Sequence, residues 1–202
     1  TGEIERELDT ISTLRKKCLL AMEASNCDLG VASEGSFGAH PSIFFASSDD
    51  EFLILIDKKN NLEIIARELS METNFNGKEI KTEKELFDFA KNVKFPTHGL
   101  VLRKSEKDFT QIIKGIIDSA VLKQSFEKLL GESNSVYVET DMRAMYNPTR
   151  MTVIENATKK DIAGIIIEYI EKSAKPRKKM CQRKITFCVV GHLILEEKLK
   201  GV

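Results

Sequence analysis

Residues 51–70 read EFLILIDKKNNLEIIARELS, and this stretch decides the class of fold. Residues 51–57 form a continuous apolar run, which is typical of a strand buried on both faces. The KKNN that follows, residues 58–61, predicts a turn, and residues 62–70 are then the expected partner strand. The stretch therefore predicts a β-hairpin.

Helices and strands alternate on both sides of this hairpin. Apolar residues at helical spacing predict a helix over 9–24, and a short apolar strand follows at 27–32. Downstream, the patterns predict a helix over 82–93, with a capping box from Thr82 to Glu85, and then a strand after Gly99. A helix over 109–131, with a break near Gly115, and a strand over 135–142 are expected next. Two helices are expected from Pro148 to residue 174, the first capped by Asn147 and the second by Thr158. We therefore expect an α/β fold in which a mixed sheet with at least one hairpin is flanked by helices.

The length of 202 residues is enough for one domain with its own core. No repeat or linker is visible up to about residue 174. We expect a single α/β domain over residues 1–175. Residues 176–202 form an atypical tail with a basic run and an apolar segment.

The charge balance excludes several classes of protein. Lysine plus arginine equals aspartate plus glutamate at 31 each, so no net positive field is present to attract nucleic acid. No apolar run approaches the length of a membrane span, and no signal peptide opens the chain. Four scattered cysteines suggest reduced thiols rather than a disulfide scaffold. We expect a cytoplasmic protein without membrane contact, and we do not expect a nucleic-acid partner.

The segment ETDMRAMYNPTRM, residues 139–151, is the most informative polar cluster. Glu139 and Asp141 lie two apart on an expected strand, so both point to one face, where they could hold Mg²⁺. Arg143 and Arg150 can bind phosphate or carboxylate, and the helix that follows Asn147 adds backbone donors for an anion. The alternative is an internal salt-bridge network with an Asn-Pro helix cap.

Three other clusters surround expected strand ends. In ASEGSFGAHP, residues 32–41, the glycines allow close approach of a ligand to the backbone. The stretch Asp49-Asp50-Glu51 offers further metal ligands or a base to activate water; its alternative is a solvated turn. Two loops contribute a third group, for which a purely structural role is the alternative: Thr73, Asn74 and His98. The chain contains neither a phosphate-binding P-loop, nor a dinucleotide-binding glycine motif, nor a nucleophile elbow.

The motifs ASEGSFGAHP, ETNFNG, FPTHGLVLR and ETDMRAMYNPTRM together resemble an uncharacterised, mostly bacterial family of domains of unknown function. The resemblance covers residues 1–175. It implies an upstream segment with a strand, which this chain lacks, and a zinc-ribbon-like C-terminus, in place of which the chain has CQRKITFCVVGHLILEEKLKGV.

Residues 13–38 are also similar to a segment of nucleotide pyrophosphatases of the inosine-triphosphatase and Maf-like type. This resemblance implies that Glu34 is a metal ligand or a base. It further implies that Lys16 or Lys17 faces phosphate and that Arg150 contacts the nucleotide.

The sequence thus favours a Mg²⁺-dependent hydrolase that acts on a nucleotide or another phosphorylated small molecule. The alternative is a non-catalytic ligand-binding or regulatory domain, and a homodimer is compatible with either. The expected catalytic residues are Glu34, Asp50 and His98. The expected ligand-binding residues are Lys16, Ser36, His40, Thr73, Asn74, Arg143, Asn147 and Arg150, and the expected metal ligands are Glu34, Glu139 and Asp141.

Overall fold

The computed structural model describes residues 8–172 of the chain, and these form two compact units. Among the described residues, unit 1 takes Phe37–Asp49 and Ser70–Thr152, and unit 2 takes residues 8–36, Asp50–Leu69 and residues 153–172. Neither unit is a continuous stretch of sequence, so no linker marks the division. Within residues 8–172, no helix is long and apolar enough to cross a membrane.

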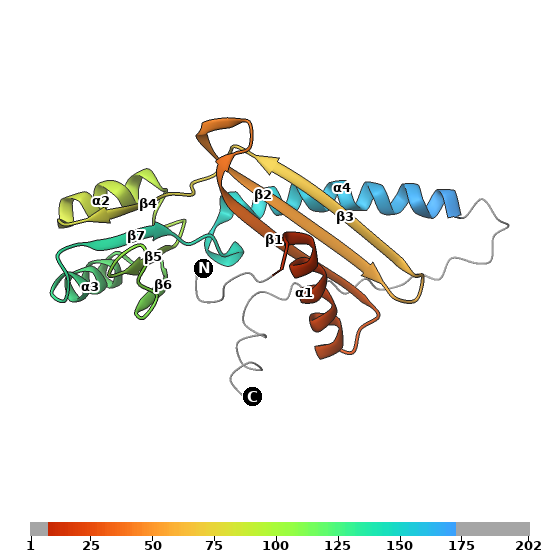
Figure 1. Cartoon of the computed structure of the whole chain (residues 1–202), viewed down its shortest axis with the longest axis horizontal. Helices are drawn as coiled ribbons and strands as arrows, with labels where there is room; N and C mark the ends of the chain where they lie inside the picture. Colours follow the sequence, from red (N-terminus) through yellow and green to blue (C-terminus); the bar gives the residue numbers. More distant parts are fainter. Residues whose placement is uncertain (1–7, 173–202) are drawn as a thin grey trace. The chain divides into compact units, whose positions relative to one another are not determined.

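The hairpin at residues 51–70 belongs to a three-stranded antiparallel sheet of order β1-β2-β3 (Figure 1). The strands are β1 (Leu29–His40), β2 (Ile43–Asp57) and β3 (Leu62–Ser70), so the predicted partner strand is confirmed. Short turns join the three strands in succession, which makes two consecutive hairpins.

Helix α1 (Thr10–Ala24) covers one face of this sheet in unit 2. Asp9 caps the helix by accepting hydrogen bonds from two backbone N–H groups of its first turn. Leu14, Cys18 and Met22 recur at helical spacing and pack against Ile54 and Ile56 of β2. Each fully buried apolar side chain of this kind contributes about 1.5–3 kcal/mol, so the seam holds α1 on the sheet.

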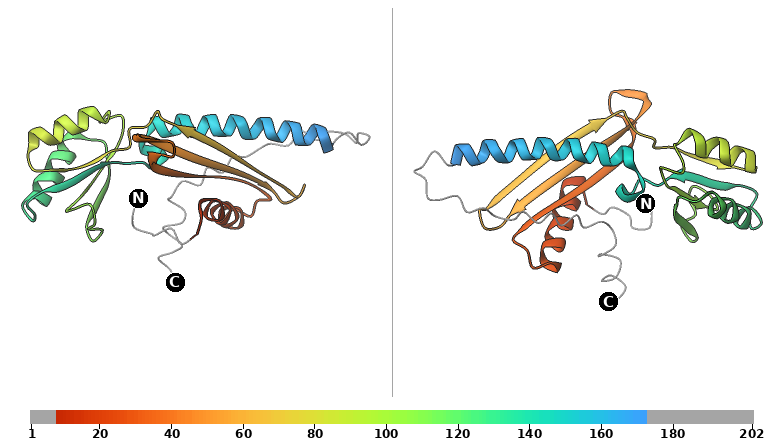
Figure 2. Two further views of the ribbon diagram at one scale, coloured as in Figure 1. Left: turned by 45° about the horizontal axis from the view of Figure 1, so that its top comes forward. Right: turned by 180° about the vertical axis from the view of Figure 1, so that it is seen from behind.

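Helix α4 (Pro148–Lys172) lies against the opposite face of the same sheet, as the two views of Figure 2 show. In unit 2, Lys160 forms an ion pair with Glu68 of β3, and a methyl group at Gly164 would be in ordinary contact with Ile64. The two faces of the sheet are thus covered by helices from opposite ends of the sequence. The predicted class, α/β with hairpins flanked by helices, is confirmed, although the strands divide between two sheets.

Unit 1 contains the second sheet, which has four antiparallel strands in the order β4-β7-β5-β6. The strands are β4 (Gly77–Ile80), β5 (Leu100–Arg103), β6 (Ile112–Ile116) and β7 (Val136–Thr140). Helices α2 (Glu83–Asn92) and α3 (Ser119–Leu130) pack on one face, around a core that includes Leu86, Phe126 and Val138. The predicted capping box of α2 is present, with both Thr82 and Glu85 making their reciprocal bonds.

The opposite face of the second sheet carries the polar residues. The register pairs Val101 of β5 with Glu139 of β7, and Arg103 with Tyr137. Because side chains alternate along a strand, these four residues share the face that points away from Leu102 and Val138 of the core. This alternation places Glu139 and Arg103 side by side.

Two strands are longer than the sequence suggested. The strand expected over residues 27–32 continues to His40 as β1, and β2 begins at Ile43 rather than at residue 51. The solvated turn considered for Asp49–Glu51 is therefore wrong: both Asp49 and Glu51 are buried within a strand. Gly30 of β1 allows α1 to pack closely on the sheet, since a side chain there would collide with Met22 of α1.

The predicted helix over residues 109–131 is also wrong in its first half. Residues 112–116 form β6, and the helix begins only after Asp118, whose carboxylate caps it. Gly115 adopts a φ of +68°, which ends any helical path there, and the β-branched isoleucines favour a strand.

A further correction concerns α4, which is one continuous helix rather than two. Thr158 caps nothing, because its hydroxyl donates a hydrogen bond to the carbonyl of Ile154 one turn earlier.

Candidate functional site

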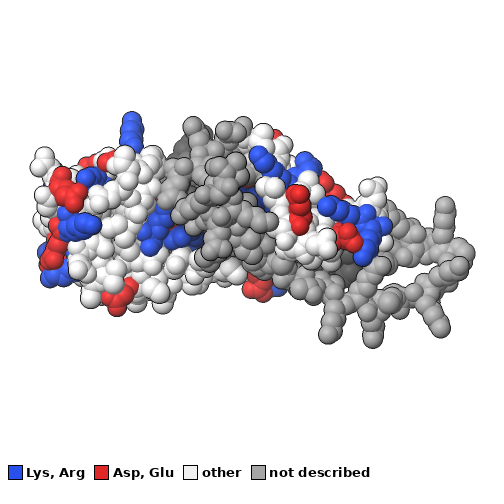
Figure 3. Space-filling model, turned by 90° about the horizontal axis from the view of Figure 1, so that it is seen from below, with Lys and Arg blue, Asp and Glu red and all other residues white. Residues whose placement is uncertain are grey.

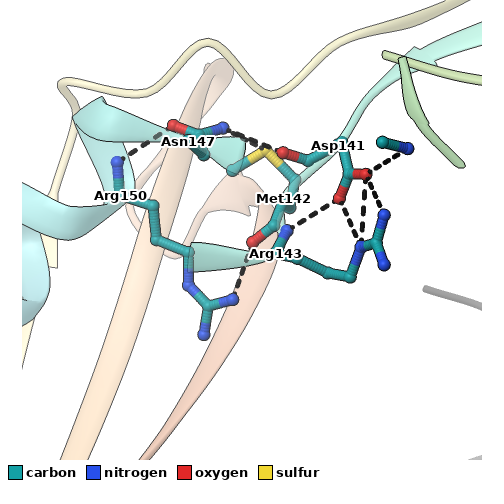
Figure 4. Close-up of polar contacts among 6 residues, drawn as sticks. Asp141, Met142, Arg143, Asn147 and Arg150 are labelled. Carbon is teal, nitrogen blue, oxygen red and sulfur yellow. Dashed lines mark hydrogen bonds and ion pairs between the residues drawn. The ribbon is translucent and has the colours of Figure 1, made fainter. Parts of the chain in front are cut away.

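The segment 139–151 connects β7 to α4 through a short 3₁₀ helix, η1 (Ala144–Tyr146). Figure 4 shows the polar contacts made by Asp141, Met142, Arg143, Asn147 and Arg150 of this segment. The segment lies wholly in unit 1.

Asp141 is at the centre of these contacts and has no solvent exposure. Arg143 binds its carboxylate at two points, with Nη2 at 2.6 Å from Oδ2 and Nε at 3.0 Å from Oδ1. The backbone N–H of Arg143 donates to Oδ1 and that of Gly115 to Oδ2 (Figure 4). The carboxylate therefore meets four donors from its own chain, as a buried charge requires.

Asn147 begins α4, as the sequence predicts. Its Oδ1 accepts the N–H of Arg150 at 3.0 Å, and its carbonyl accepts the N–H of Met151. Its Nδ2 donates to Oδ1 of Asn74 at 2.8 Å, and Asn74 in turn donates to the carbonyl of Val93. The two buried asparagines thus tie the helix start to the loop before β4 and to the end of α2.

The two arginines of the segment are held against aromatic rings. The guanidinium of Arg143 lies 4.5 Å from the ring centre of Tyr146. Arg150 donates through Nη1 to the carbonyl of Met142 at 2.6 Å and lies 5.1 Å from the ring centre of Phe37. Stacking and hydrogen bonding fix both guanidinium planes while leaving each side chain partly exposed.

Glu139 pairs with Arg103, a residue that the sequence patterns did not single out. Nη2 of Arg103 lies 2.7 Å from Oε2 of Glu139. Arg103 is buried, and its guanidinium lies between the rings of Phe109 and Tyr137. Burial raises the pKa of the Glu139 carboxyl, and the Arg103 cation opposes that rise. The sequence signal for Arg103 is its place at the end of the expected strand LVLR, where side chains alternate between the two faces.

His98 is buried near the start of α4. Its Nδ1 lies 3.0 Å from the hydroxyl of Thr97, and its Nε2 lies 2.9 Å from the hydroxyl of Thr149. Burial lowers the pKa of His98, and the neighbouring Lys94 cation lowers it further. The backbone N–H of Thr149 also donates to Nε2, so this histidine occupies a donor that was expected to serve an anion.

The other expected site residues make local contacts. The ring of His40 accepts a hydrogen bond from the N–H of Ser42 in the turn after β1, and Thr73 accepts one from the N–H of Phe75. Ser36 is half-buried in β1, and Lys16 is exposed on α1.

Two expected catalytic carboxylates belong to unit 2, whereas the segment 139–151 belongs to unit 1. Glu34 forms an ion pair with Lys17 of α1. Asp50 accepts two hydrogen bonds from Arg67, at 2.7 and 2.8 Å. Glu34 and Asp50 thus belong to a different unit from Glu139 and Asp141.

Three of these carboxylates, Glu34, Glu139 and Asp141, were expected to hold a metal ion. Within residues 8–172, no three histidine, cysteine, aspartate or glutamate side chains are grouped so that they could hold a metal ion. The face drawn in Figure 3 shows basic and acidic side chains interspersed rather than gathered into an area of one sign. The cysteines and histidine of the tail, Cys181, Cys188 and His192, lie outside the described residues.

Comparison with known proteins identifies the family of the chain. The profile of a domain of unknown function, DUF6671, matches residues 17–188, and the chain therefore belongs to this family. Comparison with the curated proteins and with the solved structures gave no match.

Proposed function

We propose that this member of the DUF6671 family binds a phosphorylated small molecule, such as a nucleotide, through Arg143 and Arg150 in unit 1. The observation that carries the proposal is the fixed placement of the two guanidinium groups. Each lies over an aromatic ring, and each is also held by an acceptor, Asp141 or the carbonyl of Met142.

Fixed arginines suit phosphate recognition for an energetic reason. A free arginine side chain loses about 2 kcal/mol of rotamer entropy when it is immobilised. In this segment the fold has already immobilised both side chains, so an anion that binds them does not have to offset that loss. Lys94 lies beside the same helix start, with Nζ 3.5 Å from the Thr149 hydroxyl, and adds a third positive charge.

The proposal is tested by titrating the full chain with ATP, ADP and pyrophosphate in a calorimeter. We expect binding of at least one of them, and we expect Arg150→Lys to weaken it about tenfold or more, because a charge-assisted hydrogen bond contributes about 1.5–3 kcal/mol. The matched control is Arg67→Lys, since Arg67 is likewise an arginine that is hydrogen-bonded and placed over a ring, but in unit 2. Equal effects of the two variants, or no binding of any of the three ligands, would overturn the proposal.

A second candidate, magnesium-dependent hydrolysis of the same ligand, is favoured by Glu139. This carboxylate lies two residues before Asp141, is partly exposed, and has a raised pKa, as proton-transfer groups often do. Arg103 contacts its Oε2. Magnesium commonly binds through one or two carboxylates together with substrate phosphates, so Glu139 is the residue that would hold an ion arriving with the ligand.

Hydrolysis is tested separately from binding. Phosphate or pyrophosphate release is measured with and without MgCl₂, for the wild type and for Glu139→Gln. We expect release that requires magnesium and that Glu139→Gln abolishes. Ligand binding without release of phosphate or pyrophosphate would support the binding function and overturn the proposed hydrolysis.

A further inference from the structure

His98 connects the loop before β5 to the first turn of α4. Both of its ring nitrogens have partners within unit 1, and only 5% of the residue is exposed. On one side Nδ1 contacts the hydroxyl of Thr97. On the other side Nε2 contacts both the hydroxyl and the backbone N–H of Thr149, at 2.9 and 3.3 Å.

The partners determine which nitrogen carries the proton. The hydroxyl of Thr97 donates its hydrogen to the carbonyl of Lys94 at 2.6 Å, so it can only accept from His98, and Nδ1 must be the N–H. The backbone N–H of Thr149 can only donate, so Nε2 must be the acceptor. The contacts therefore require a neutral imidazole with its proton on Nδ1.

A second chain of contacts closes the network. Nζ of Lys94 lies 3.5 Å from the hydroxyl of Thr149, which frees that hydroxyl to donate its own hydrogen to Nε2. The network thus begins at the side chain of Lys94 and ends at its carbonyl. In this arrangement every hydrogen has an acceptor, and Nε2 accepts hydrogen bonds rather than carrying a proton.

We propose that His98 is a proton-sensitive lock on the first turn of α4. In the closed state the neutral imidazole holds this turn by accepting from Thr149, and in the open state protonation of the imidazole has broken its contact with the Thr149 N–H. A proton on Nε2 would face the N–H of Thr149, so that two donors point at each other. The imidazolium would also lie at the positive end of the helix dipole, which disfavours a cation. The hydroxyl of Thr149 can still accept from a protonated Nε2, so the contact that protonation breaks is the one with the backbone N–H of Thr149.

The cation of Lys94, on the loop beside His98, also disfavours protonation of the imidazole. Arg150 lies in the facing turn of α4, but its guanidinium binds the carbonyl of Met142. The nearest carboxylate along the network, Asp141, is bound by Arg143 and by two backbone N–H groups, and its own N–H donates to the carbonyl of Gly99. Because burial and then Lys94 lower the pKa of His98, the lock is closed at neutral pH and opens in acid.

This lock is independent of the proposed ligand, because it rests on contacts inside the protein. It acts on the turn that carries Arg150, whose N–H is capped by Asn147 rather than by His98. The amide of Thr149 therefore reports on the lock, and the amide of Arg150 is an internal reference in the same turn.

Nuclear magnetic resonance of the full chain labelled with ¹⁵N tests the proposal directly. Two-bond ¹H–¹⁵N spectra should show His98 as the Nδ1–H tautomer at neutral pH, with a pKa below the usual value of about 6.5. After correction for intrinsic rates, hydrogen exchange of the Thr149 amide should rise severalfold when the pH falls through that pKa. The Arg150 amide should change less.

Variants separate His98 from the other histidines. His98→Asn should remove the pH-dependent rise in Thr149 exchange, whereas His40→Asn, in the turn after β1, should leave it unchanged. If His98→Asn fails to fold, Thr149→Val keeps the backbone N–H and removes only the hydroxyl, and exchange of the amide of residue 149 should still rise when His98 is protonated. An Nε2–H tautomer, or Thr149 exchange that ignores the protonation of His98, would overturn the proposal.

Discussion

Asp141 and Arg143, two residues apart in the chain, form a two-point ion pair in which the carboxylate is completely buried. The guanidinium is partly exposed and lies over Tyr146. This pair orders the turn between β7 and α4. The carboxylate that was expected to hold magnesium is thus bound by an arginine of its own segment.

We expect Arg143→Ala to lower the free energy of unfolding by about 3–5 kcal/mol, because it leaves the buried Asp141 charge without its cation. Urea denaturation of the full chain measures this value. The matched control is Arg67→Ala, which breaks a more exposed pair with Asp50 and should change stability by less than about 1 kcal/mol. Similar losses in the two variants would contradict a special role for the buried pair.

Gly115→Ala should destabilise the protein for two reasons. The backbone there has a φ of +68°, and a methyl group would lie 2.7 Å from the ring of Tyr146. We expect a loss of about 1–3 kcal/mol. Gly164→Ala is the opposite case, because its methyl group would meet Ile64 at an ordinary 3.5 Å within α4, and it should stabilise the protein by about 0.5–1 kcal/mol. Thermal unfolding of both variants measures whether Gly115→Ala is destabilised and Gly164→Ala is stabilised relative to the wild type.

Glu139 should make a contribution to stability that is lost as the pH rises. Its pKa in the folded protein is raised above the usual 4.5, so the folded state holds the proton more tightly, and this contribution is present below 4.5 and lost as the pH rises through the folded pKa. Relative to the wild type, Glu139→Gln should therefore become more stable between pH 4 and pH 7. Urea denaturation at several pH values measures the trend.

Glu85 is the control for this trend, because its pKa is lowered by the hydrogen bond from the backbone of Lys81 and by others in the capping box. Its contribution to stability is present above the usual 4.5 and is lost as the pH falls. The stability of Glu85→Gln relative to the wild type should thus fall as the pH rises. The same dependence of relative stability on pH in Glu85→Gln and Glu139→Gln would contradict the opposite pKa shifts of the two carboxyls.

The cysteines of unit 2 should differ sharply in reactivity. Cys18 is fully buried in the seam of α1, and burial raises the pKa of its thiol to about 11, whereas Cys27 is exposed. Since the thiolate is the reactive form, iodoacetamide at pH 8 should label Cys27 in the folded chain and leave Cys18 unmodified until urea is added. Peptide mass spectrometry identifies the labelled residues, and early labelling of Cys18 would show that α1 opens readily.

Much of the local structure could be predicted because the signals for it lie within a few residues. The spacing of Leu14, Cys18 and Met22 indicates α1, and the capping box of Thr82 and Glu85 marks the start of α2. The hairpin of residues 51–70 also follows from its own pattern. The error at 109–131 has a local cause of another kind, since apolar residues there fit both periodicities, and the backbone of Gly115 decides between them.

The partners of the polar residues could not be predicted in the same way. Glu139 lies in a strand as predicted, whereas Asp141 follows the end of β7, and only the pairing of β5 with β7 brings Arg103 to Glu139. Likewise, the hydrogen bonds of Asn74 with Asn147 and of His98 with Thr149 join residues about 50 to 70 positions apart in the sequence.

The sequence by itself thus determined the class of the fold, most helices and strands, and the segment 139–151 as the polar centre of the chain. The tertiary structure decided that the strands form two sheets and that the charges of this segment are paired internally. The physical reason is range: periodicity and capping act within a turn or a strand, whereas ion pairs and buried hydrogen bonds join whichever segments the packing of the core brings together.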